Sequence, residues 1–171
     1  GDRIATASDP DDWVAIYADL VSWGMDLFAY SDHGLLDTQA EQMAAADLAV
    51  GKYVRERYCD WIAGGRDAPL MSHDVFGAWV EPEIERSEQV LLIVIDCMRL
   101  DQWRMVEGLL EPFFHVDRRH YWSILPTATP YARNALFAGM LPREIARQFE
   151  RLWHDGLRPE GSRNAFENEL L

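Results

Sequence analysis

Apolar residues recur at three- and four-residue spacing in the first third of the chain and form short continuous runs after it. The first stripe follows Asp9 and Pro10, which are typical of a helix N-cap and of the first helical position. It predicts an amphipathic helix to about residue 29, with either a core or a partner surface on its apolar side. Its members are Trp13, Ile16, Tyr17, Leu20, Trp23 and Leu27.

A second, longer helix is expected from about residue 38 to about residue 62. Gly64 and Gly65, which follow, are expected to end it. The loop between these two helices should include His33. Residues 1–8 are expected to fray. A short helix capped by the residues around Ser72 should stop near Pro82, because proline removes a backbone donor and disrupts a helix interior.

A continuous apolar run from Val90 to Ile95 ends at Asp96, and four of its six residues are β-branched. This pattern is typical of a buried parallel strand that carries an acid to the C-terminal edge of a sheet, where ligands and metals gather. Further strands are expected at 113–116 and 121–125, with helices at 99–110 and 132–140. The fold class is therefore expected to be α/β, with a helical bundle followed by the opening of a sheet.

The turn before the last of these helices places Thr127 and Thr129 near a helix start. A hydroxyl there faces the positive end of the helix dipole, where a phosphoryl oxygen can also bind. Together with Asp96, it gives the minimal arrangement for metal-assisted phosphoryl transfer. The structural alternatives are that Asp96 is a turn or capping residue and that the threonine is an N-cap.

Composition limits the class of protein. The chain has 171 residues, 49% of them apolar and 26% charged, which is typical of a globular protein. A net charge of −13 opposes binding to exposed nucleic-acid backbone unless a metal ion or a local cluster of arginines intervenes. Cys59 and Cys97 have no metal or redox spacing, and neither a signal peptide nor a membrane-spanning apolar run is visible. A cytoplasmic location without membrane contact is expected.

Several motifs resemble a known family. They are the segment Val94 to Asp96 followed by Arg99 to Trp103, and the run from Ile124 to Asn134. The similarity extends back to residues 72–76 and to the helix that holds Trp13 and Trp23. Together they resemble the PglZ domain of the alkaline phosphatase superfamily, and more narrowly the PorX-type response regulators.

This resemblance implies a zinc-dependent phosphodiesterase or phosphatase that acts on phosphoesters, including oligonucleotides. It implies Asp96 as a zinc ligand, and Thr129 as both nucleophile and metal-bound group, with Thr127 as a lesser candidate. Gly139 and Pro142 lie ten and thirteen residues after Thr129, as in related phosphodiesterases. The resemblance also implies that Asn134 or Arg133 holds a substrate phosphate oxygen.

The resemblance also implies a two-component response regulator of type IX secretion, with a sensor kinase and a sigma factor as partners. The alternative is a signalling and oligomerisation module without catalytic output, and a third interpretation is an unrelated α/β domain with a chance motif. The expected domains are a helical linker at 1–48 and a truncated N-terminal part of PglZ at 49–171, helical to about 88. Such a fragment is expected to be inactive by itself and to form homo-oligomers.

Overall fold

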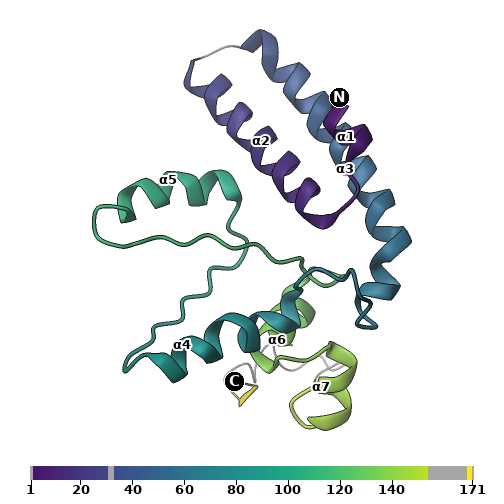
Figure 1. Ribbon diagram of the computed structural model, residues 1–171, viewed down its shortest axis with the longest axis vertical. Coiled ribbons are helices and arrows are strands. Elements are labelled where there is room, and N and C mark those ends of the chain that lie inside the picture. The colour runs from purple at the N-terminus through teal and green to yellow at the C-terminus, as the bar shows by residue number, and fades with distance from the viewer. Residues whose placement is uncertain (1, 31–32, 154–168, 171) are drawn as a thin grey trace, which may run out of the picture. The chain divides into compact units, whose positions relative to one another are not determined.

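The computed structural model describes residues 2–30, 33–153 and 169–170. The chain divides into two compact units. The first unit, Gly1–Ala68 with Cys97–Arg118, holds α1 (Asp2–Thr6), α2 (Pro10–Ala29), α3 (His33–Trp61) and α5 (Leu100–Leu110) (Figure 1). The second unit, Pro69–Asp96 with Arg119–Leu171, holds η1 (Ser72–Asp74), η2 (Phe76–Val80), α4 (Glu81–Arg86), α6 (Thr129–Ala138) and α7 (Pro142–Gln148).

The start of α2 confirms the predicted cap. The Asp9 side chain accepts a hydrogen bond from the backbone N–H of Asp12 at 2.8 Å, and the Asp12 side chain accepts one from the backbone N–H of Asp9. These bonds satisfy N–H groups that a helix start leaves unpaired. The backbone donors Ser8 and Asp9 hold the pKa of the Asp12 carboxyl below its usual value.

An aromatic cluster forms the core of the first unit. The ring of Tyr53 on α3 packs against Trp13 of α2 and against Trp61, with centroid separations of 5.7 Å in both pairs. The guanidinium of Arg57 lies 4.1 Å from the centroid of the Tyr53 ring. Burial raises the pKa of the Tyr53 hydroxyl. The predicted apolar stripe of α2 is therefore confirmed as core at Trp13.

Helices α2 and α3 pack side by side (Figure 1). The Gln39 side chain crosses from α3 and donates to the backbone carbonyl of Leu20 at 3.1 Å. A Cβ at Gly24 would lie only 3.0 Å from the Gln39 amide nitrogen, so this glycine permits the close approach.

Two expectations for this unit are wrong. Residues 2–6 form the helix α1, where fraying was expected, and Arg3 pairs with Asp19 of α2. This tertiary ion pair gives the short helix support that its own sequence does not provide. The helix α3 begins at His33, five residues earlier than expected, so His33 is not a loop residue.

The second unit is organised around η1 and α6, which pack together. Trp122 pairs with the backbone beside Met71 through two hydrogen bonds, of 2.8 Å and 3.0 Å. The buried Ser72 hydroxyl accepts the backbone N–H of Ile124 at 3.1 Å. The core residues here are Met71, Val75, Ile124, Ala135, Leu136, Leu141 and Ile145.

The expected α/β sheet is not found within the described residues, where only an isolated bridge joins Met71 and Trp122. Residues 90–95 form neither a strand nor a helix, and these residues are 39–83% exposed. Val90, Leu92 and Val94 line an apolar groove with residues of η2, α4 and α6. A β-strand forms only when its backbone N–H and C=O groups bond to those of a neighbouring strand. No described segment pairs with residues 90–95 in this way.

The other strand predictions are also wrong. Residues 111–114 form turns after α5, and 121–125 contain only the bridge at Trp122. Pro82 does not stop a helix. It lies in the first turn of α4. Backbone N–H groups in a first turn have no intrahelical acceptor, so the helix loses no hydrogen bond to the proline there. The sequence from Arg158 to Glu169 is polar and predicts a loop, and residues 158–168 of it lie outside the described residues.

The helices expected at 99–110 and 132–140 are confirmed as α5 and α6. The helix α6 ends at Gly139, whose φ of 60° places it in the left-handed conformation that glycine adopts readily. None of the helices in the described ranges has the length and apolar character needed to cross a membrane.

Candidate functional site

The candidate site lies where the segment 90–96 ends beside the start of α6. The Thr129 hydroxyl donates a hydrogen bond of 2.9 Å to the Oδ2 atom of Asp96. The Nη1 atom of Arg133 lies 3.2 Å from the same carboxylate oxygen. Two donors from one helix therefore meet a single acceptor atom, and all three residues belong to the second unit.

The helical period of α6 explains this convergence. Thr129 and Arg133 are four residues apart, so they lie on the same side of the helix one turn apart. The N-cap position belongs to Ala128, and Thr129 is the first residue of the helix itself. The structural alternative, in which Thr129 is the N-cap residue, therefore does not apply. Its hydroxyl instead contacts an acid 33 residues earlier in the chain.

The other predicted residues have different surroundings. Thr127 is exposed in the turn before α6. Asn134 is only 3% exposed and lies in the interior of the second unit. An anion approaching the start of α6 would therefore meet the partly exposed Arg133 and not Asn134. The roles suggested for these residues remain predictions.

Tyr121 is a neighbour of the site that the sequence did not single out. Its pKa is raised, first by burial and then by the negative charge of Asp96. Its ring packs edge-on against Trp79 at a centroid separation of 6.2 Å. The sequence analysis placed Tyr121 at the start of an expected strand. Nothing in the sequence pattern indicated that it lies near a functional site and is more than a packing residue.

The chemistry of this arrangement follows from the contacts. The Asp96 carboxylate orients the Thr129 hydroxyl and accepts its hydrogen bond, while the Arg133 guanidinium supplies positive charge beside it. The positive end of the α6 dipole adds a weak attraction for anions of about 0.3–1 kcal/mol. The three groups together suit a negatively charged, oxygen-rich ligand such as a phosphoryl group.

A zinc ion requires more than these residues offer. Structural and catalytic zinc sites use three or four protein ligands. Among the described residues, no group of three or more His, Cys, Asp and Glu is arranged to hold a metal. The Oδ2 atom of Asp96 also pairs with the cationic Arg133, and that charge disfavours a metal ion at the same atom. The described residues therefore do not form a complete zinc site.

Comparison with protein families gives two matches. Residues 75–171 match the BREX system PglZ alkaline phosphatase-like domain, and residues 1–62 match the PorX response regulator linker domain. No curated protein matches the chain. The PglZ match covers more than half of the sequence and contains Asp96, Thr129 and Arg133. The chain thus joins a PorX-type linker to PglZ sequence, and it belongs to the PglZ family.

Proposed function

We propose that this PglZ domain cleaves phosphoric esters, with Thr129 as the nucleophile. The observation that supports the proposal is the hydrogen bond from the Thr129 hydroxyl to Asp96 at the start of α6. A threonine hydroxyl is a weak nucleophile unless another group helps to remove its proton. The match to an alkaline phosphatase-like domain supports the same class of chemistry.

In the proposed reaction the Thr129 oxygen bonds to phosphorus as the ester oxygen leaves. The hydroxyl proton passes to the Asp96 carboxylate that already accepts its hydrogen bond, and from there to the leaving ester oxygen, which departs as an alcohol. Arg133 offsets the negative charge on the phosphoryl oxygens. Water then hydrolyses the phosphothreonine and restores the hydroxyl. We propose oligonucleotides among the substrates, and zinc as the cofactor, with Asp96 and Thr129 supplying only part of its ligand set.

The test uses the complete product of the gene, assayed with bis-p-nitrophenyl phosphate and added zinc. We expect Thr129→Ala to lower kcat at least about a hundredfold, because removal of a nucleophile eliminates the covalent route. Thr127→Ala is the matched control and should keep the parent rate. Loss of hydrolysis in Thr127→Ala with full activity in Thr129→Ala would assign the nucleophile to Thr127 instead.

The linker match supports a second candidate function, in which the protein acts in signalling without catalytic output. We propose in this case a cytoplasmic response regulator of type IX secretion. It would be controlled by a sensor kinase, bind a sigma factor and self-associate on phosphorylation. The exposed apolar side chains of residues 90–95 support self-association, because such surface is usually covered by a partner.

Thr129→Val separates the two functions, because valine has nearly the shape of threonine but lacks the hydroxyl. If the signalling function is correct, cells that carry Thr129→Val in the full-length gene should secrete normally while the purified protein no longer hydrolyses esters. Secretion that falls in parallel with hydrolysis would show that catalysis is the output.

A further inference from the structure

The side of α3 that lies opposite α2 is exposed in the middle of the helix. Ala46 and Tyr53 are buried on the side that packs on α2. Leu48, on the opposite side, is 80% exposed. A single exposed leucine is common on protein surfaces, so the meaning of Leu48 depends on the residues around it.

The exposed positions around Leu48 follow the helical period. Ala45 and Gly51 lie three residues before and after it, and Glu41 and Arg55 lie seven residues before and after it. Steps of three and seven residues stay on one side of an α-helix. All five residues are exposed, and four of them line a shallow hollow on the surface of α3. They form a stripe about 21 Å long, which we call the α3 stripe.

No contact within the described structure accounts for Gly51. A Cβ at this position would meet no other described atom within 4 Å. Glycine in a helix interior is less stable than alanine by about 1 kcal/mol. A glycine is useful where a second backbone comes close, because it has no Cβ to hold that backbone away. The small side chain of Ala45 leaves similar room on the other side of Leu48.

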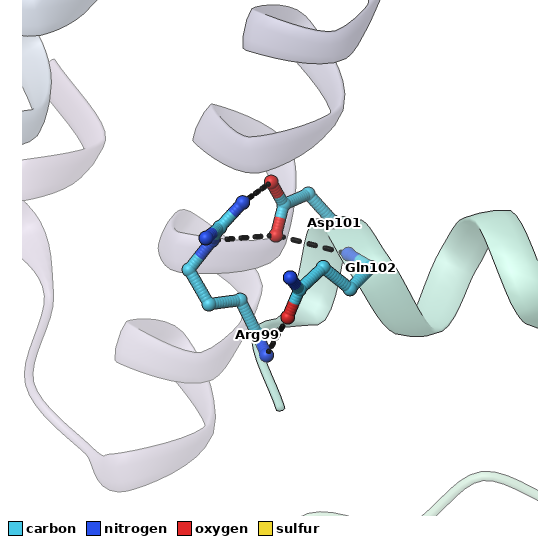
Figure 2. Close-up of polar contacts among 3 residues, drawn as sticks. All are labelled: Arg99, Asp101 and Gln102. Atoms are coloured by element: carbon cyan, nitrogen blue, oxygen red, sulfur yellow. Dashed lines mark hydrogen bonds and ion pairs between the residues drawn. The ribbon is translucent and has the colours of Figure 1, made fainter. Parts of the chain in front are cut away.

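The two ends of the α3 stripe carry opposite charges. Elsewhere in the first unit such charges pair within the chain. The Arg99 guanidinium, for example, donates to both carboxylate oxygens of Asp101 at 3.0 Å and 2.7 Å (Figure 2). Neither Glu41 nor Arg55 has an ion-pair partner among the described residues. The α3 stripe therefore has an unpaired negative charge at one end and an unpaired positive charge at the other.

We propose that the α3 stripe binds the same stripe of a second copy of this chain, as an antiparallel pair of helices. A two-fold axis beside Leu48 places residues at equal distances from Leu48 opposite each other. Leu48 then contacts its own counterpart, and Ala45 contacts Gly51 of the second copy. Glu41 of each chain pairs with Arg55 of the other. A parallel pair would place Glu41 against Glu41 and Arg55 against Arg55, and these like charges repel.

This dimer should be weak and depend on protein concentration. Two helices in contact over about 21 Å bury less than the minimum of about 1,200 Å² that is typical of stable interfaces. The net charge of −13 on each chain opposes association further. Salt at about 0.15 M screens charges that lie more than about 8 Å apart, so the close pairs at the ends of the stripe are weakened least. We expect a Kd on the order of 100 μM under these conditions.

Sedimentation equilibrium of the 171-residue chain tests the proposal through charge reversal. We expect Glu41→Arg and Arg55→Glu each to raise the Kd of the dimer about tenfold, because two ion pairs become two contacts between like charges. The double variant Glu41→Arg/Arg55→Glu should associate about as tightly as the parent. An equimolar mixture of the two single variants should do the same, since their charges are complementary only between chains.

The two single reversals change the net charge of the chain in opposite directions. Glu41→Arg makes the chain less negative, so general repulsion alone predicts tighter association for this variant. The α3 stripe predicts weaker association for both variants. Tighter association of Glu41→Arg would therefore overturn the proposal. Helical circular dichroism equal to that of the parent would show that the variants are folded.

Leu48→Asp is an independent test, because it places two like charges beside the two-fold axis. We expect it to raise the Kd at least about a hundredfold, since it also removes the central apolar contact. Leu109→Asp is the matched control. Leu109 is an α5 leucine that is 72% exposed and lies outside the stripe, so its replacement should leave the Kd unchanged.

Two results would overturn the proposal outright. One is a parent chain that stays monomeric well above the expected Kd. The other is a dimer that persists in Leu48→Asp, which would assign self-association to another surface such as residues 90–95 of the second unit. The inference rests on neither proposed function, although it would supply the self-association of the second. Its failure would leave the assignment of Thr129 unaffected, because sedimentation does not depend on hydrolysis.

Discussion

Replacing Trp61 with alanine is expected to lower the free energy of unfolding of the first unit by about 3–5 kcal/mol, the usual range for a large aromatic residue removed from a core. The side chain is only 4% exposed and packs against Tyr53, which also contacts Trp13. The cavity would therefore open at the end of α3, where a single aromatic cluster holds α2 and α3 together. Urea unfolding followed by helical circular dichroism would measure the change.

Phe28→Ala provides the matched control for this substitution. Phe28 is an aromatic residue of α2 that is 80% exposed, so its removal should change the free energy of unfolding by less than about 0.5 kcal/mol. An equal loss of stability in the two variants would show that the cluster around Tyr53 is not the core of the unit. A stable Trp61→Ala protein would have the same consequence.

The helices could be predicted from sequence because their signals are local. Asp9 and Pro10 begin α2 through contacts within four residues, and the spacing of Trp13 and Ile16 marks its buried side. Whether an apolar run forms a strand could not be predicted in this way. The run from Val90 to Ile95 has the composition of a buried strand, but a strand also needs a partner backbone, which depends on distant parts of the chain.

Part of the candidate site could be predicted from the sequence. An acid after an apolar run and a threonine before a helix suggested that Asp96 and Thr129 meet, and the structure brings them to 2.9 Å. The second donor to Asp96 was not foreseen, because Arg133 was expected to face the substrate. Arg104 donates a hydrogen bond to Ser22, which lies 82 positions earlier in the chain, and no local sequence pattern predicts this contact.

Residues 1–171 alone are expected to show no phosphodiesterase turnover and no tight zinc binding. Zinc held by a protein takes three or four ligands, and the described residues offer Asp96 and Thr129 at this position. Arg133 competes for the same carboxylate oxygen. The α6 dipole contributes about 0.3–1 kcal/mol towards an anion. Enzymes lower the barrier by at least about 8 kcal/mol, so these groups fall far short.

Isothermal titration with zinc, and hydrolysis of bis-p-nitrophenyl phosphate with and without zinc, would check this expectation, with Thr129→Ala as the background control. The predicted result is the same baseline rate in both proteins at every zinc concentration. Zinc-dependent hydrolysis that disappears in Thr129→Ala would contradict it. Because such activity requires further ligands close to Asp96, that result would mean that residues outside the described ranges complete the site within this chain.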